Sequence, residues 1–237
     1  MWLKKEAEAE PKFDTLGAKA LLWNGYLQRQ YTLVCKVCPY GKVLTFVEVG
    51  HIDPTPWETW ARIFQIFGPH GWRVGFFPHP AKRVLPEPGQ PVGPGNVNGG
   101  YAYPCKPNSI IIYREEEATR VLLHELFHAA CCDRDLELPQ KEAETEAWAE
   151  WLLVALASKG KLSKAKELFQ EQLNWMAATH ATLERFYGIK GPEDYAWRYT
   201  IGREEAYCRL GATVPKARIQ KPRTSSRLTS PVLDKLE

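Results

Sequence analysis

The residues best suited to chemistry lie together at His124-Glu125-Leu126-Phe127-His128, an H-E-x-x-H sequence. An α-helix has about 3.6 residues per turn, so positions i and i+4 share a face and both imidazoles can point at one ion. Imidazole nitrogens suit zinc, and two of them form half of a tetrahedral site. Glu125 would sit beside such an ion, where a carboxylate can take a proton from a bound water as general base. The spacing therefore predicts a catalytic zinc site on this helix.

The residues around the motif are apolar on nearly every side of the expected helix, which indicates a buried helix. Burying two histidines and a glutamate without partners is costly, so we expect them to share one. The alternative is a pair of core histidines that ordinary hydrogen bonds satisfy.

The next expected helix, residues 140–158, carries Glu142, Glu146 and Glu150 at intervals of four residues. Like charges on one helix face repel each other. A solvated face explains this stripe, but the neighbouring Trp148 and Trp151 favour burial. A cation facing the stripe would remove the repulsion, and zinc needs a third protein ligand.

The H-E-x-x-H sequence, the seventeen residues that follow it and Glu146-Ala-Trp-Ala-Glu-Trp151 together resemble the gluzincin metallopeptidases. This resemblance covers about thirty residues and implies a superfamily rather than a member. It implies that His124, His128 and Glu146 bind zinc and that Glu125 is the catalytic base.

Many gluzincins carry an acidic residue four positions after the ligand glutamate, hydrogen-bonded to the first histidine. Glu150 has this spacing, and such a partner fixes the tautomer of the histidine and raises its basicity. Glu142 and Glu144 stay open as alternative ligands.

The resemblance implies zinc-dependent hydrolysis of peptide bonds, with a peptide or protein substrate. One alternative is a metallopeptidase-like protein that keeps zinc for structure or binding without turnover. Another is a DNA-associated protease similar to the SprT-like proteins, although these usually supply a third histidine and none lies between His128 and His180. A third is a binding module with an accidental motif and no metal.

Strand patterns at 31–37, 43–49, 72–77 and 109–113 precede or alternate with helical patterns at 55–67, 119–130, 140–158, 163–187 and 193–210, the last interrupted at Gly202. This order predicts an α+β fold. It is similar to the zincin arrangement, in which a small N-terminal twisted sheet packs on the metal helix and a mostly helical half follows. The resemblance further implies an edge strand that binds extended peptide, either 109–113 or 72–77. Gluzincins often stabilise an oxyanion with a His or Tyr in the helical half. In this chain four side chains there are chemically suitable, namely His180, Tyr187, Tyr195 and Tyr199. We assign none of them to this role.

We predict an N-terminal extension over 1–30, a metallopeptidase domain over 31–211 and a flexible basic tail over 212–237. The domain divides into 31–132, with the sheet and metal helix, and 140–211. The loop at 78–107 is rich in Gly and Pro, and either shapes substrate access or is a plain surface excursion. The tail is either a solvated terminus or an arm for nucleic acid or an acidic partner.

The chain has 237 residues and a formal net charge of +3, too small to indicate a nucleic-acid partner for its body. No apolar run is long enough to span a membrane, and the N-terminus has charges where a signal peptide needs an apolar run. We therefore expect an intracellular, by default cytoplasmic, protein with mostly reduced cysteines. Cys35 and Cys38 form a C-x-x-C without a second such pair, so they are either two cysteines in a turn or part of a second metal site.

Overall fold

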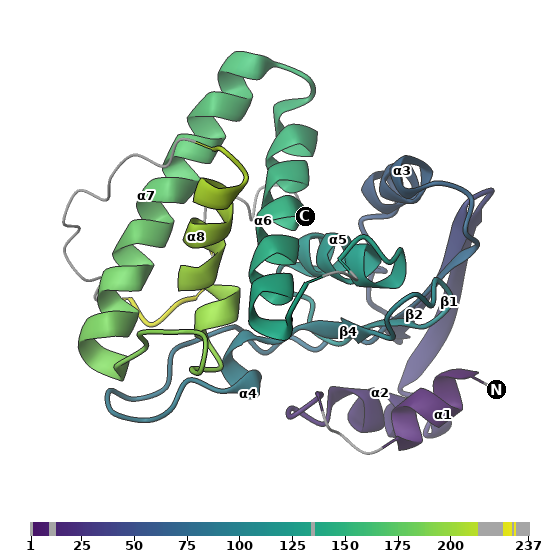
Figure 1. Ribbon diagram of the computed structural model, residues 1–237. Helices are drawn as coiled ribbons and strands as arrows, with labels where there is room; N and C mark the ends of the chain where they lie inside the picture. The colour runs from purple at the N-terminus through teal and green to yellow at the C-terminus, as the bar shows by residue number, and fades with distance from the viewer. Residues whose placement is uncertain (1, 10–12, 134–135, 213–224, 229, 231–237) are drawn as a thin grey trace. The chain divides into compact units, whose positions relative to one another are not determined.

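The computed structural model describes residues 2–9, 13–133, 136–212, 225–228 and 230. Within these residues the chain forms eight α-helices and one five-stranded mixed sheet, which confirms the predicted α+β class (Figure 1). The chain divides into two compact units. The sheet unit comprises Met1–Lys82 and Asn98–Cys132, and the helical unit comprises Arg83–Val97 and Asp133–Leu236.

The sheet has the strand order β1-β2-β3-β5-β4. The strands are β1 Tyr31–Cys38, β2 Gly41–Glu48, β3 Trp72–Phe76, β4 Gly100–Ala102 and β5 Ile110–Ile112. A two-residue turn joins β1 and β2 into an antiparallel hairpin. β3 pairs in parallel with both β2 and β5, and β4 closes the sheet antiparallel to β5.

The edge of the sheet next to β5 is formed by β4, a strand that the sequence analysis did not predict. The expectation that 72–77 or 109–113 forms an edge is wrong, because β3 and β5 both lie inside the sheet. Three residues that include a glycine are too few to show the alternation by which a strand is recognised in a sequence.

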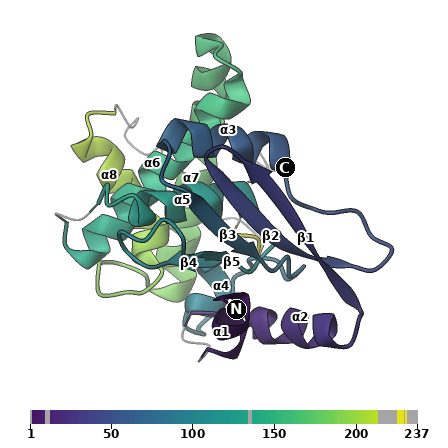
Figure 2. The ribbon, with the colours of Figure 1, turned by 90° about the vertical axis from the view of Figure 1, so that its right-hand side faces the viewer.

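Helices cover both faces of the sheet (Figure 2). α1 Trp2–Glu8 and α2 Ala18–Leu27 cover one face, and their buried side chains form one apolar cluster with residues of the sheet region. This cluster contains Leu3, Leu22, Trp23, Phe46, Phe77 and Ile111. α3 Trp57–Phe67 and α5 Ala118–Ala129 cover the other face, where the Trp60 ring lies 5.2 Å from that of Phe76. Trp60 Nε1 also donates a hydrogen bond of 3.0 Å to Thr119 Oγ1, which connects α3 to α5.

The helical unit contains α4 Pro94–Val97, α6 Leu138–Ser158, α7 Leu162–Tyr187, α8 Ile201–Arg209 and the short 3-10 turn η1 Trp197–Tyr199. The sequence predicts an interrupted helix over 193–210, with the break at Gly202. The structure has the break two residues earlier, at Thr200, between η1 and α8, and residues 193–196 are not helical. A Cβ added at Gly202 would lie 2.7 Å from the Trp197 ring. The Trp197 ring therefore packs directly on the α8 backbone.

Part of the Gly- and Pro-rich loop is built into the core of the helical unit. Leu85 and Val92 are 5% and 4% exposed and belong to one cluster with Leu183 and Trp197. Residues 225–228 lie beside the start of this segment, where Leu85 N donates to Ser226 O and Leu228 N donates to Arg83 O. The other basic residues of the predicted tail lie outside the described residues, namely Lys216, Arg218, Lys221, Arg223 and Lys235.

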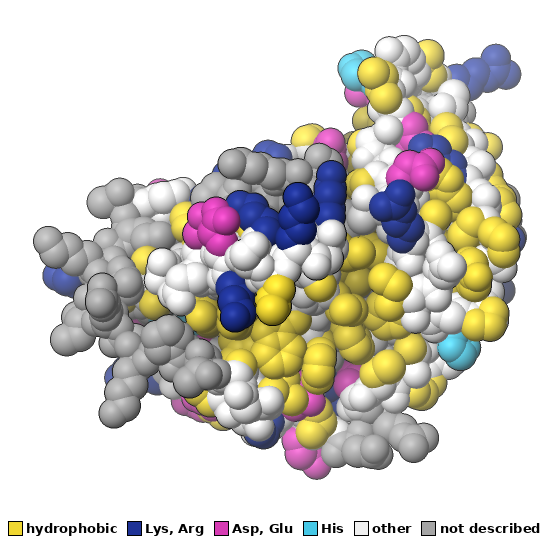
Figure 3. Space-filling model, turned by 90° about the horizontal axis from the view of Figure 1, so that it is seen from above, with side chains coloured by type: hydrophobic (Ala, Val, Ile, Leu, Met, Phe, Trp, Pro, Cys, Tyr) yellow, Lys and Arg dark blue, Asp and Glu magenta, His cyan; other side chains and the backbone are white. Residues whose placement is uncertain are grey.

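Across the described residues, no helix is both long and apolar enough to cross a membrane. Figure 3 shows hydrophobic side chains exposed on one face, with basic and acidic side chains interspersed among them. This mixture of charges agrees with the small formal net charge of +3.

Candidate metal site

The helix α5 carries the H-E-x-x-H residues into the interior of the sheet unit. It lies against β4, β5 and α3, so side chains on most of its circumference are buried. His124, Glu125 and His128 are only 6%, 6% and 9% exposed. Polar groups buried to this degree require partners, because their hydration has been lost.

The two histidines converge as the spacing predicts. His124 Nε2 and His128 Nε2 lie 2.9 Å apart, and their ring centroids lie 4.6 Å apart. Four-coordinate zinc holds nitrogen ligands at about 2.0–2.1 Å, which places two such nitrogens about 3.3 Å apart. At 2.9 Å the two nitrogens can share a hydrogen bond, and a small adjustment would let them share one ion instead, so the two residues fit a metal.

Glu125 lies beneath the edge strand β4. A Cβ added at Gly100 would lie 2.6 Å from Val121 Cγ1 and 3.5 Å from Glu125 Cγ. Only glycine allows the strand backbone to come this close to the helix. The contact places Glu125 beside β4, the strand at this end of the sheet.

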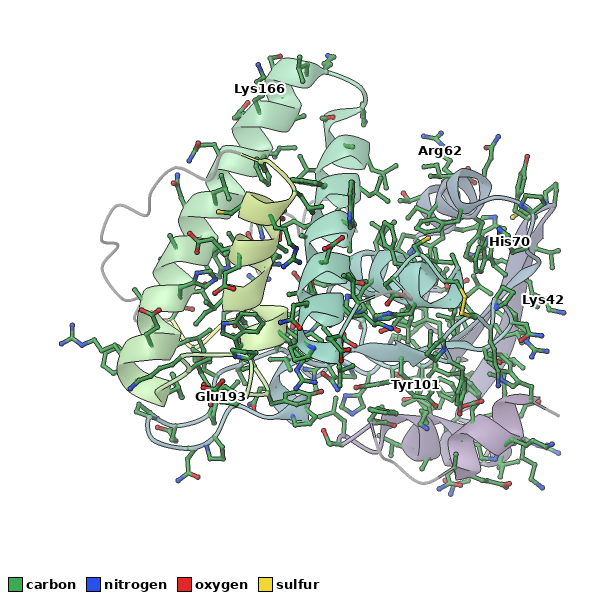
Figure 4. The ribbon with its side chains drawn as sticks, in the orientation of Figure 1. Lys42, Arg62, His70, Tyr101, Lys166 and Glu193 are labelled. Atoms are coloured by element: carbon green, nitrogen blue, oxygen red, sulfur yellow. A yellow bond between two sulfur atoms is a disulfide. The ribbon has the colours of Figure 1, made fainter. Side chains whose placement is uncertain are left out.

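A disulfide that the sequence analysis did not predict lies at the other end of the motif. It joins Cys105, in the loop after β4, to Cys131, just after α5 (Figure 4). The backbone N–H groups of Cys105 and Cys131 both donate to the carbonyl of His128, at 3.0 and 3.2 Å. The other four cysteines, Cys35, Cys38, Cys132 and Cys208, lie outside this bond.

The acidic stripe of α6 belongs to the helical unit. Glu146 is 6% exposed and Glu150 is fully buried, so the stripe is not a solvated face. Glu150 accepts hydrogen bonds from Tyr207 Oη at 2.7 Å and from Gln172 Nε2 at 3.1 Å. Arg203 Nη1 lies 2.6 Å from Glu150 and 4.0 Å from Glu146, so an arginine of α8 supplies a cation to the stripe.

These partners of Glu150 are the residues that sequence reasoning missed. Arg203, Gln172 and Tyr207 lie on other helices, and no local spacing connects them to α6. Burial and the nearby charge of Glu150 raise the pKa of the Tyr207 hydroxyl well above its ordinary value, which keeps it a donor. The predicted role of Glu150 as the partner of His124, and that of Glu146 as a zinc ligand, stay predictions.

The side chains considered for an oxyanion role have structural partners in the helical unit. His180 Nδ1 lies 2.6 Å from Glu204 Oε2, and Tyr187 Oη donates to Pro86 O at 2.8 Å. Burial raises the pKa of Tyr199, whose ring lies 5.4 Å from that of Tyr195.

The C-x-x-C pair lies on a strand rather than in a turn. Cys35 and Cys38 are both in β1, where residues three apart point to opposite faces of the sheet. Both thiols are reduced. Their opposite directions disfavour a second metal site, which leaves the interpretation as two ordinary cysteines.

We found no protein-family model, curated protein or solved structure that matches this chain.

Proposed function

We propose that the chain is a zinc-dependent peptidase of the zincin kind, which hydrolyses peptide bonds with Glu125 as general base. One observation carries the proposal. Two buried imidazole nitrogens converge to 2.9 Å on one helix, and a buried glutamate follows the first of them. A pair of packing histidines does not need this glutamate, whereas metal-assisted hydrolysis does.

His124 and His128 supply two ligands, and we propose Glu146 as the third. Glu142 is the alternative, since His124, His128 and Glu142 are a donor set of the kind that holds a metal ion. Glu144 is a weaker choice, because Arg209 Nη2 lies 2.9 Å from its carboxylate at the surface. Two imidazoles and a carboxylate suit zinc and leave one position of a tetrahedral site open.

A zinc ion held by these residues would supply Lewis-acid chemistry, which acidifies water and polarises a peptide carbonyl. The Glu125 carboxylate accepts the proton of the attacking water and passes it to the nitrogen of the departing amine. Its burial beneath β4 excludes bulk water from this proton transfer.

The free edge of β4 is the proposed place for an extended substrate. Tyr113 N donates to Gly99 O, and this register directs the peptide groups of Tyr101 toward β5. The peptide groups of Gly100 and Ala102 then point to the open edge, where a peptide can add as a strand. Glu125 lies below Gly100, within reach of a peptide bound there.

Metal content and hydrolysis test the proposal together. We expect about one zinc per chain by elemental analysis, and loss of zinc from His128→Ala. Glu125→Gln should keep the zinc and lose cleavage of a broad peptide library. Glu146→Ala and Glu142→Ala, measured side by side, identify the third ligand by which one weakens zinc binding.

Two results would contradict the proposal. One is the absence of zinc even after refolding with it. The other is a Glu125→Gln variant that cleaves peptides as fast as the parent.

A further inference from the structure

The Cys105–Cys131 disulfide fastens the segment that borders the motif. The chain passes Glu125 at Gly100 and reaches the end of α5 at Cys105, whose N–H donates to His128 O. Residues 100–105, which we call the strap, therefore follow α5 from the proposed base to the second proposed ligand. The disulfide closes the strap onto the helix and joins two cysteines whose sequence separation is 26.

Apart from the disulfide, the end of the strap is held by surface contacts, among them the hydrogen bond from Cys105 N to His128 O and the packing of the Tyr103 ring on Tyr101. Tyr103, Pro104, Cys105 and Lys106 are all exposed, so few apolar contacts order them. Segments with few buried contacts open locally at low free-energy cost. Cys105 and Cys131 also have φ of 62° and 60°, a left-handed conformation that is unfavourable for cysteine. Without the covalent bond, the strap end would lose its main restraint.

The disulfide is accessible to a reductant. Cys105 is exposed and Cys131 is half-buried. Exposed disulfides are the ones that exchange readily and serve regulation, whereas buried ones are structural.

We propose that the Cys105–Cys131 disulfide is a redox-operated clasp that controls the proposed metal site through the strap. This inference rests on the proposed function and adds its regulation. The oxidised clasp keeps His128 at a well-ordered helix end, because both cysteine N–H groups hold its carbonyl. Reduction opens the strap, disorders the helix end and weakens the metal site.

The chemistry is thiol–disulfide exchange with a dithiol reductant. One thiolate of the reductant attacks Cys105 Sγ, and Cys131 leaves as a thiolate that takes up a proton. The second thiol of the reductant then resolves the mixed disulfide. Two electrons and two protons pass to the protein, and the reductant becomes a disulfide.

The test uses the full chain before and after treatment with a phosphine reductant, which offers zinc no thiolate. Hydrogen exchange is measured first without metal. We expect faster exchange over 103–107 and 127–132 after reduction, in the wild type only. Cys105→Ser should show the fast exchange before any reductant is added, which separates loss of the clasp from other effects of reduction.

Zinc affinity is measured next, by competition with a chromophoric chelator. We expect reduction to weaken zinc binding on the order of tenfold, the scale seen when groups that orient metal ligands are lost. Cys35→Ser, which removes an exposed reduced thiol of β1, is the matched control and should respond to reduction as the wild type does.

The outcomes separate this inference from the proposed function. Exchange that reduction leaves unchanged would overturn the clasp, whatever the zinc result. Equal zinc affinity in both redox states would overturn the regulation alone. Zinc binding in neither state would overturn the proposed function and the regulation with it.

Discussion

At the scale of single residues, the charges of the helical unit are balanced by long-range partners. Glu150 is fully buried, and its carboxylate is surrounded by Arg203, Tyr207 and Gln172. A buried carboxylate is tolerated only when such partners replace its hydration. The repulsion expected along α6 is therefore relieved in part by an arginine.

We predict that Arg203→Met destabilises the protein by about 3–5 kcal/mol, because it leaves a buried carboxylate without its cation. Urea denaturation measures the loss. Arg209→Met is the matched control, since it breaks an exposed pair with Glu144 and should cost less than about 1 kcal/mol. Adding Glu150→Gln to Arg203→Met should recover part of the loss, and a double variant no more stable than Arg203→Met would argue against the pair.

A second residue-scale prediction concerns acid stability. The hydrogen bond from His180 lowers the pKa of Glu204 below its ordinary value of 4.5, although burial opposes this shift. Because the folded pKa is the lower one, ionised Glu204 stabilises the fold above the ordinary value. This contribution is lost as pH falls through the folded pKa.

We therefore expect the wild type to lose more free energy of unfolding than Glu204→Gln between about pH 6 and about pH 3. Chemical denaturation at a series of pH values measures this. Glu205→Gln changes the neighbouring, exposed carboxylate, and its free energy of unfolding should depend on pH as that of the wild type does. If the free energy of unfolding of Glu204→Gln falls with pH as steeply as that of the wild type, the ion pair with His180 contributes nothing to acid stability.

At the scale of elements, β4 is held from both sides. Tyr101 Oη donates to Glu6 Oε2 at 2.8 Å and accepts from Lys19 Nζ at 2.9 Å, which ties the strand to α1 and α2 (Figure 4). On the opposite face, Gly100 lies directly against α5. A short strand with one edge open is thus kept in place by side-chain contacts more than by its own length.

Substitution of Gly100 tests this close approach. We expect Gly100→Ala to destabilise the protein by about 1–3 kcal/mol, because the new methyl group overlaps Val121 and the Ile111 carbonyl. Thermal or urea denaturation measures it, and any peptide hydrolysis should fall as well because Glu125 lies below the strand. Gly93→Ala is the control, since a Cβ there meets no atom within 4 Å. Equal stability of the two variants would mean that β4 is not pressed against the helix.

At the scale of the whole molecule, the parts that the sequence predicted are those governed by local spacing. The convergence of His124 and His128 follows from helical periodicity, and β1, β2, β3 and β5 follow from runs of apolar β-prone residues. β4, the clasp and the partners of Glu150 depend on segments far apart in the chain. No local pattern identifies such pairings, so they needed the structure.

The path of the chain also brings together segments that are far apart in the sequence. Residues 83–97 leave the sheet unit between β3 and β4 and complete the core of the helical unit. Their Gly- and Pro-rich composition predicts a loop and does not indicate that two of its side chains, Leu85 and Val92, belong to the core. The helical unit is therefore assembled from segments that the sequence separates.

We predict that Leu85→Ala costs about 2–4 kcal/mol of stability, because it leaves a cavity beside Leu183 and Trp197. Val84→Ala, at the adjacent and 42% exposed position, keeps the backbone bridge to Arg227 and should cost about 0.5 kcal/mol or less. Urea denaturation of both full-length variants gives the comparison, and proteolysis locates the loosened region. If Leu85→Ala is as stable as Val84→Ala, residues 83–97 lie on the surface and contribute little to the core of the helical unit. If Leu85→Ala is destabilised and α6 to α8 become sensitive to protease, residues 83–97 are a structural part of the helical unit, although they lie in sequence between β3 and β4.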